Sequence, residues 1–336
     1  MLFIDNQSIT KPQINLAIEE YALKNLPADE TYLLFYINEP SIIIGKNQNT
    51  VEEINTEYVE QNGIHVVRRL SGGGAVYHDH GNLNFSFITK DDGESFHNFR
   101  KFTEPVVQAL RKLGVDAELS GRNDIQVGER KISGNAMFAT KGRLFSHGTL
   151  LFQSDIEHVV SALRVKADKI QSKGIKSIRS RVANITEFLE KPMTIEEFRQ
   201  ELLETIFGMS ASEVPQYVLT EKDWEAIHEL SAERYGNWDW NYGKSPKSEL
   251  VNSKRFPAGT IDVRMNLEEG RIGKMKIYGD FFGVKDVEEI ERLLTGVKYD
   301  TLSLEQALEG TDITAYFGAV GKEEFIGLLT LKGEEA

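Results

Sequence analysis

Hydrophobic and polar positions alternate along this chain with two different periods, which separate the expected helices from the expected strands. From residue 96 to residue 113, apolar side chains recur every three or four positions, with Pro105 inside the stretch and Gly114 at its end. This spacing is typical of the buried face of an amphipathic helix. From residue 83 to residue 87, leucine and phenylalanine alternate with polar residues, as in a half-buried strand. The chain therefore predicts a protein that contains both kinds of element.

The same two patterns predict the other elements. Helices are expected from a cap at Asn15 and over residues 52–61, 155–163, 194–206, 221–235, 287–294 and 323–329. Strands are expected over residues 31–37, 41–44, 64–67, 115–119, 124–127, 131–138, 143–152, 260–267 and 273–278. Thr194 followed by Glu197 predicts a capping box at one helix start.

The length of the chain indicates two domains. A chain of 336 residues is longer than chains that usually fold around a single hydrophobic core. Tryptophans beside a stretch with glycine and proline at residues 236–246 indicate a chain that packs onto one domain and then leaves it. We place the boundary near residue 245, which gives a large domain of residues 1–245 and a small α+β accessory domain of residues 246–336.

Charge and composition exclude several classes of protein. The formal net charge is −13 and the pI is about 5.2, which argues against a nucleic-acid-binding protein, because such proteins need a basic face. No apolar run approaches the roughly 20 residues of a membrane span, and the first residues lack the features of a signal peptide. We therefore expect a cytoplasmic protein without a membrane partner. The absence of cysteine excludes disulfides, thiolate metal ligands and cysteine nucleophiles.

The most unusual composition lies between Arg68 and Phe87. Two arginines precede Ser71 and three consecutive glycines, and the run Ala-Val-Tyr-His-Asp follows. Such glycines are typical of a backbone that needs positive φ or that a ligand approaches closely. Main-chain amides with guanidinium groups beside them suit a phosphate or a carboxylate. The glycines alone fit a plain hairpin turn equally well; together with the residues on both sides, they favour an anion site.

A second group combines an acid and an amine on adjacent expected strands. Asp124 begins one strand, and Lys131 begins the next, seven residues later. A hairpin would carry the carboxylate and the amine into the same pocket. Taken alone, a lysine such as Lys131 is more often a surface residue. His147, on the strand expected over residues 143–152, is likewise more often a core histidine. A functional role for either residue therefore depends on the glycine motif.

Together these motifs resemble the lipoate-protein ligase family, whose signature is Arg-Arg-x-Ser-Gly-Gly-Gly-Ala-Val-aromatic-His-Asp followed by Gly-Asn-Leu-Asn. Residues 68–84 match this signature, and residues 131–136 and 146–151 match further motifs of the family. The resemblance implies a large α+β catalytic domain with a mixed, mainly antiparallel sheet flanked by helices, similar to biotin ligases and class II synthetases. It also implies a small α+β C-terminal domain.

The resemblance implies an ATP-dependent reaction in two steps. Lipoate attacks the α-phosphorus of ATP to give lipoyl-AMP and pyrophosphate, and a lysine of a lipoyl domain then attacks the mixed anhydride. The expected partners are lipoyl domains of 2-oxoacid dehydrogenase E2 subunits or the glycine cleavage H protein. Relatives that transfer the acyl group through a cysteine are excluded, because this chain has none.

The resemblance also assigns roles to single residues. Lys131 is the expected catalytic residue, which bridges the lipoate carboxylate and the α-phosphate. The expected ATP and adenylate contacts are Arg69, Gly74, Ala75, Val76, Tyr77, Asp124 and Lys131. The expected lipoate contacts are Arg69, Ser71, Gly73, Lys131 and His147. Asp124 is also the candidate for organising Mg²⁺, a hard ion that prefers carboxylates and phosphates.

Three questions stay open at this point. The acid could be octanoate or a lipoyl-peptide donor in place of free lipoate, and a non-catalytic protein that binds the cofactor or its adenylate would keep the same pocket. The general base for the transfer step is not visible in the sequence. The run of residues 164–181 holds seven basic residues and one acid, and it is either a solvated face or a surface that meets an anion.

Overall fold

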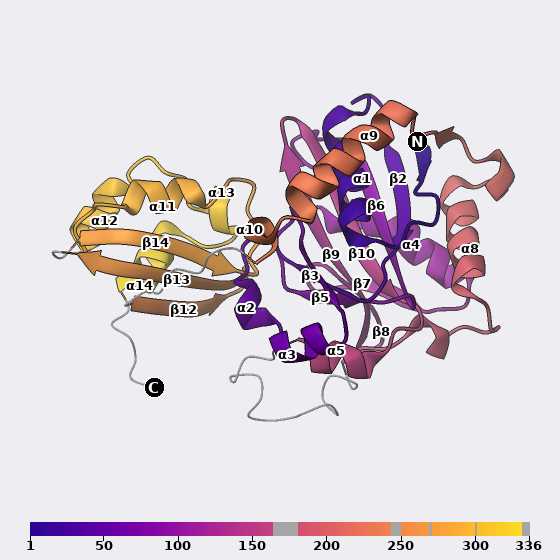
Figure 1. Ribbon diagram of the computed structural model, residues 1–336, viewed down its shortest axis with the longest axis horizontal. Coiled ribbons are helices and arrows are strands. Elements are labelled where there is room, and N and C mark those ends of the chain that lie inside the picture. Colours follow the sequence, from indigo (N-terminus) through magenta and orange to yellow (C-terminus); the bar gives the residue numbers. More distant parts are fainter. Residues whose placement is uncertain (164–180, 243–249, 269–270, 300, 331–336) are drawn as a thin grey trace. The chain divides into compact units, whose positions relative to one another are not determined.

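The structure is a computed structural model of the chain (Figure 1). It describes residues 1–163, 181–242, 250–268, 271–299 and 301–330. Two compact units are present. The first comprises Met1–Ile44, Thr50–Arg69 and Ala75–Tyr242, and the second comprises Gly45–Asn49, Leu70–Gly74 and Gly243–Ala336. The boundary expected near residue 245 and residues 164–180 of the basic run lie outside the described residues.

The first unit contains an eight-stranded sheet with the strand order β11-β1-β2-β6-β10-β9-β8-β7. β1 pairs in parallel with β2 and β11, and the other neighbours are antiparallel. An α+β protein with a mixed, mainly antiparallel sheet is therefore confirmed. The strands are β1 (Leu2–Asp5), β2 (Tyr32–Ile37), β6 (Asn82–Lys90), β7 (Ala117–Ser120), β8 (Asp124–Val127), β9 (Arg130–Thr140), β10 (Arg143–Leu151) and β11 (Gln216–Tyr217).

A smaller sheet and several helices complete this unit. The small sheet has the order β4-β3-β5, with β3 (Ser41–Ile44), β4 (His65–Arg68) and β5 (Val76–His78). The α-helices are α1 (Pro12–Asn25), α2 (Thr50–Glu53), α3 (Thr56–Gln61), α4 (Phe99–Lys112), α5 (Ile156–Ala162), α8 (Ile195–Phe207), α9 (Glu221–Leu230) and α10 (Trp238–Asn241). Short 3-10 turns occupy Ile185–Glu187 and Ala211–Glu213, and Ser231–Tyr235 is a π-helical turn that continues α9.

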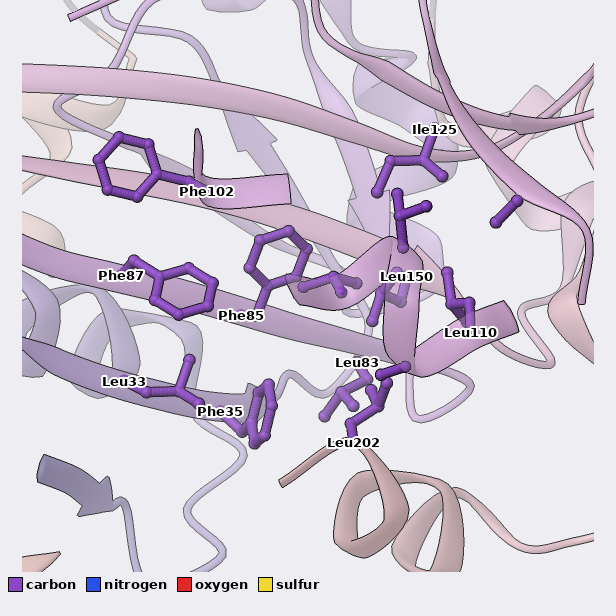
Figure 2. Close-up of a cluster of buried hydrophobic side chains, with 14 of the residues drawn as sticks. Leu33, Phe35, Leu83, Phe85, Phe87, Phe102, Leu110, Ile125, Leu150 and Leu202 are labelled. Carbon is purple, nitrogen blue, oxygen red and sulfur yellow. The ribbon is translucent and has the colours of Figure 1, made fainter. Parts of the chain in front are cut away.

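The alternating pattern of β6 separates the two faces of the large sheet. Leu83, Phe85 and Phe87 join the main hydrophobic core, together with side chains of α4 and α8 (Figure 2). The intervening polar residues of β6 point to the opposite face, because successive side chains of a strand alternate. Helix α1 packs against β6 and β10, and its buried residues include Asn15 and Glu19. One face of the sheet is thus apolar and the other carries polar groups.

Some local expectations are wrong, and each has a tertiary reason. Asn15 does not cap α1, because the helix begins three residues earlier, at Pro12. The side chain of Asn15 is buried, and it donates to the Ile9 carbonyl at 2.9 Å. The helix expected over residues 52–61 is divided into α2 and α3. Pro105 does not interrupt α4, whose apolar side is buried along its whole length.

Pairing between strands also departs from their order in the chain. The strands expected over residues 31–37 and 41–44 exist as β2 and β3, but they belong to different sheets. β4 pairs in parallel with one edge of β3, and β5 pairs antiparallel with the other edge. The glycine turn therefore connects two strands that do not pair with each other, so it is not a hairpin turn.

The second unit has its own hydrophobic core. Its antiparallel sheet consists of β12 (Leu250–Phe256), β13 (Gly259–Glu268) and β14 (Arg271–Gly279). Its helices are α11 (Glu288–Leu294), α12 (Thr301–Ala307), α13 (Thr314–Phe317) and α14 (Lys322–Thr330). β13, β14, α11 and α14 correspond to predicted elements, whereas β12, α12 and α13 were not predicted.

Candidate active site

Asp124 and Lys131 form an ion pair on the β8–β9 hairpin. The Lys131 Nζ and the Asp124 Oδ1 are 2.8 Å apart, and their side chains are 37% and 31% exposed. Asp124 lies opposite Gly134, and a register shift between Ile125 and Gln126 places Lys131 opposite Gln126. The hairpin thus brings together the acid and the amine that the sequence pattern had placed on adjacent strands.

Gly134 leaves the space in which the lysine side chain lies. A Cβ atom at this position would be 3.0 Å from the Lys131 Nζ and 3.1 Å from its Cε. Because this is tighter than ordinary van der Waals contact, a side chain at residue 134 would require the end of the lysine side chain to shift by a few tenths of an ångström. The glycine therefore permits the lysine to extend over β9 toward Asp124.

A buried polar group lies beneath α1, formed by Glu19, Tyr36, Arg69, His78 and His147. The His147 Nδ1 is 2.9 Å and 3.0 Å from the two carboxylate oxygens of Glu19, and both residues are buried. Because a carboxylate only accepts hydrogen bonds, Nδ1 carries the proton. The Arg69 Nη1 donates to the main-chain carbonyl of Ile43 at 3.0 Å.

Burial controls the charges of this polar group. It lowers the pKa of Arg69 to about 10, so the guanidinium stays protonated at neutral pH. Burial, with the nearby charge of Arg69, lowers the pKa of His78 to about 3. Burial, with the charge of Glu19, raises the pKa of Tyr36 well above its ordinary value. The group therefore combines a fixed cation with a neutral imidazole and a neutral phenol at neutral pH.

The two arginines of the glycine motif have different surroundings. Arg68 donates from Nη2 to the Thr50 hydroxyl at 2.6 Å and from Nε to the Trp240 carbonyl at 2.9 Å. The Trp240 indole in turn donates to the Arg68 carbonyl at 2.8 Å. Arg68 therefore joins α10 to β4, a structural role that the sequence motif did not distinguish from the position of Arg69.

The glycine turn belongs to the second unit, which includes Ser71, Gly73 and Gly74. Gly73 has a φ of +92°, which residues with a side chain rarely adopt. A Cβ atom on Gly72 would lie 2.4 Å from the main-chain oxygen of Phe281, whereas nothing lies within 4 Å of a Cβ on Gly74. The turn therefore requires glycine at residue 73 because of its positive φ, and at residue 72 because the main chain of Phe281 lies so close.

Ala75, Val76 and Tyr77 return the chain to the first unit. The Tyr77 ring is buried in a small cluster with Ile42 and Ile44, so the ring has a structural role. β5 is an edge strand of the described three-stranded sheet. Part of its main chain therefore faces away from β3, as backbone contacts to a ligand would require.

Among the predicted site residues, Asp124 is paired with Lys131, and Arg69 lies in the same buried group as His147. Ser71, Gly73 and Gly74 lie in the other unit. Glu19, Tyr36 and His78 also belong to this group, although the sequence motifs did not predict them as site residues. A signal for Glu19 was present, since polar residues at 15 and 19 recur at helical spacing beside apolar ones in α1.

Other kinds of site find little support in the described residues. Over the described ranges of the chain, no group of three or more His, Cys, Asp or Glu side chains is arranged to hold a metal. No described helix is long and apolar enough to cross a membrane. A cavity of about 750 Å³ lies between α4 and α8, lined by residues such as Arg100 and Gln108, and none of the predicted site residues lines it.

Comparison with known proteins gives a consistent result along the chain. Residues 11–207 match the lipoyl protein ligase A/B catalytic domain, and residues 245–329 match the bacterial lipoate protein ligase C-terminus. Lipoate-protein ligase LplJ of Bacillus subtilis (strain 168) is 68% identical over 330 residues, which cover 98% of this chain and 100% of the relative. Lipoate–protein ligase 1 of Staphylococcus aureus (strain Mu50 / ATCC 700699) is 57% identical with the same coverage.

Solved structures agree with these matches. A lipoate-protein ligase A bound with ATP has a TM-score of 0.62 at 32% identity, covering 72% of this chain and 98% of that one. Plasmodium falciparum LipL1 in complex with lipoate shares the fold, with a TM-score of 0.78 at 24% identity over 98% of this chain and 97% of that one. Motifs, domain matches and full-length relatives lead to one conclusion: this chain belongs to the lipoate-protein ligase family and is an enzyme of the ligase type.

Proposed function

We propose that this protein attaches lipoate to a lysine of a lipoyl domain in two steps that use ATP. In the first step, a carboxylate oxygen of lipoate attacks the α-phosphorus, the bond to the β-phosphate oxygen breaks, and pyrophosphate leaves. In the second step, the lysine amine attacks the acyl carbon of lipoyl-AMP, AMP leaves, and the amine loses a proton. The observation that carries this proposal is the Lys131–Asp124 pair, at 2.8 Å, in a chain of this family.

Lys131 is the proposed catalytic residue. The first step brings a carboxylate and a triphosphate together, so a fixed positive charge at the point of approach lowers their repulsion. The amine is partly exposed and oriented by Asp124. In the second step the same cation would polarise the acyl carbonyl.

Arg69, Ser71, Gly73 and His147 are the proposed lipoate contacts. Arg69 supplies a buried guanidinium that stays charged at neutral pH, which suits a carboxylate. His147 is held by Glu19, so its ring orientation is fixed before any substrate arrives. Gly73 has no side chain, so lipoate could come close to its main chain.

The nucleotide is proposed to contact Arg69, Lys131, Asp124 and the main chain of residues 74–77. Mg²⁺ commonly binds one or two carboxylates together with substrate phosphates. Asp124 offers one such carboxylate, which fits a site completed by the phosphates of ATP. When bound, the ion would neutralise phosphate charge, while Asp124 orients the amine of Lys131.

The proposed acceptors are lipoyl domains of E2 subunits or of the glycine cleavage H protein. One solved relative, a bipartite ligase from Thermoplasma acidophilum with 34% identity and a TM-score of 0.64, is described together with its E2 lipoyl domain. The basic run of residues 164–181 stands out in a chain with a net charge of −13. An acidic acceptor would meet it favourably, and this attraction would weaken as salt rises.

The test is a reaction of the purified protein with a lipoyl domain, ATP, Mg²⁺ and free lipoic acid, followed by mass spectrometry of the domain. We expect one lipoyl group on one lysine, together with pyrophosphate release that starts before acceptor is added. Parallel reactions with octanoic acid and with a lipoyl-peptide identify the preferred donor. A protein that binds lipoate but releases no pyrophosphate with any donor would contradict the proposal and support a non-catalytic binding protein.

A further inference from the structure

The strand that carries Lys131 has different neighbours along its two halves. β10 pairs with β9 from residue 140 to residue 135. Near the start of β9, the short segment around Val182 forms an isolated parallel bridge with Lys131. The Lys131 amide donates to the Arg181 carbonyl at 2.7 Å, and the Ala183 amide donates to the Lys131 carbonyl at 2.9 Å. Both main-chain groups of the catalytic lysine are therefore bonded to this segment.

Residues 181–188, which we call the return segment, are fixed at several points. Ala183 and Ile185 are fully buried in the main core. The Ser154 amide donates to the Asn184 Oδ1 at 2.9 Å, and the Asn184 Nδ2 donates to the Ser154 carbonyl at 3.0 Å. The two Asn184 hydrogen bonds attach the return segment to the chain just beyond β10, in addition to its main-chain bonds to Lys131 in β9.

A side-chain contact also joins the return segment to β9, one residue from the lysine. The Arg130 Nη1 lies 2.6 Å from the Glu187 Oε2, and the guanidinium carbon lies 4.7 Å from the centre of the Phe188 ring. The other carboxylate oxygen of Glu187, Oε1, accepts from the Asn184 amide at 2.9 Å and caps the 3-10 turn. One carboxylate thus links the residue next to Lys131 to the turn of the return segment.

The exposure of this pair argues against a role in global stability. Arg130 is 36% exposed and Glu187 is 43% exposed, and exposed ion pairs contribute little to the free energy of unfolding. Its location suits a local role, because it lies one residue from a lysine whose main chain depends on the return segment. A shift of this edge would move the amine from its place above Gly134.

We propose that Arg130 and Glu187 are positioning residues for Lys131. They hold the return segment against the first half of β9, so that the lysine amine stays beside Asp124. Neither residue is assigned any contact with substrate. This inference rests on the proposed function, because the Arg130–Glu187 pair would affect the rate at which lipoyl-AMP forms.

The experiment is a double-mutant cycle with Arg130→Gln, Glu187→Gln and the double variant. Glu187→Gln keeps an oxygen that can cap the turn while it removes the charge. We expect each single change to lower kcat for pyrophosphate release about fivefold to twentyfold, since small misplacements of catalytic groups are costly. KM for lipoate and ATP should change less than about twofold, and the melting temperature less than about 3 °C. The double variant should be no slower than the slower single variant, because both changes remove one interaction.

Two controls separate positioning from general damage. Arg130→Lys keeps the charge and should retain more activity than Arg130→Gln. Lys101→Gln breaks a comparably exposed ion pair with Asp92 (2.9 Å; 46% and 49% exposed) and should leave kcat unchanged. Unchanged kcat in Arg130→Gln, or losses in the two single variants that add fully in the double variant, would overturn the proposal.

Hydrogen exchange gives a readout that does not depend on activity. In Arg130→Gln, the amides of Lys131 and Ala183 should exchange faster, while those of β10 stay protected. Unchanged exchange at both amides would also overturn the proposal. If the wild-type protein itself releases no pyrophosphate, the proposed function fails, whereas the exchange measurement still decides whether the pair holds the lysine strand.

Discussion

The two faces of strands β6 and β10 differ in what they do for the protein. On one face, Leu83, Phe85 and Leu150 are fully buried in an apolar cluster with α4 and α8 (Figure 2). On the other face, Ser86 lies opposite His147 in the β6–β10 register, beneath the helix that supplies Glu19. Adjacent residues of one strand therefore lie in different surroundings: one side chain faces the apolar cluster, and the next faces buried polar groups.

Under the proposed function, in which His147 contacts lipoate, one sheet supports stability on one face and chemistry on the other. The apolar face gains free energy from burial and close packing. The polar face buries groups that lose hydration, and it compensates with specific partners such as the Glu19–His147 pair. A mutation on the apolar face should therefore mainly affect folding, whereas a mutation on the polar face should mainly affect the reaction.

The largest effect is expected for Phe85→Ala on the apolar face. Removing a fully buried phenylalanine should lower the free energy of unfolding by about 3–5 kcal/mol. The control is Ser86→Ala on the polar face, because the Ser86 hydroxyl is buried without a hydrogen-bond partner in the described structure. That change should cost less than about 1 kcal/mol. Urea unfolding measures both, and equal losses would contradict the contrast between the faces.

The next largest effect is expected for Lys131→Ala. Pyrophosphate release should slow at least about a hundredfold, the scale for loss of one preorganised charge contact. The free energy of unfolding should change by less than about 1 kcal/mol, because the ion pair with Asp124 is partly exposed. Pyrophosphate release and circular dichroism are measured on the same preparation. A folded variant with a near-normal rate would remove Lys131 from the mechanism.

A smaller effect is expected for Glu19→Gln. The amide oxygen can still accept from the His147 Nδ1, but the charge that balances the buried Arg69 is lost. The free energy of unfolding should fall by about 1–2 kcal/mol, and KM for lipoate should rise because His147 is held less firmly. Urea unfolding and steady-state kinetics test these two expectations. An unchanged KM would confine Glu19 to a structural role.

The smallest effect is a pH dependence that arises from His78. Its pKa is about 3 in the folded protein and near 6.5 when unfolded, so the unfolded state binds more protons as pH falls below about 6.5. Stability should therefore decrease on acidification, by about 1 kcal/mol between pH 7 and pH 5.5 from this residue. His78→Gln should flatten the profile of unfolding free energy over that range. Parallel profiles for wild type and variant would show that His78 does not contribute.

The sequence by itself determined the features that depend on near neighbours in the chain. The capping box of α8 could be predicted because Thr194 and Glu197 are one turn apart, and the structure confirms it. The β8–β9 hairpin could be predicted because only a short turn separates the two strand patterns, and the hairpin placed Asp124 and Lys131 together. The family motifs were readable because each lies within a short stretch.

Tertiary structure decided the features that join distant parts of the chain. Glu19 and His147 are 128 positions apart, and no local pattern relates a helix carboxylate to a strand imidazole. Arg68 and Arg69 are identical in type and adjacent, yet only the fold brings Trp240 to the first. The pairing of β3 with both β4 and β5 likewise depends on long-range register. The physical reason is that periodicity reports which side of an element is buried, whereas only packing selects the element that covers it.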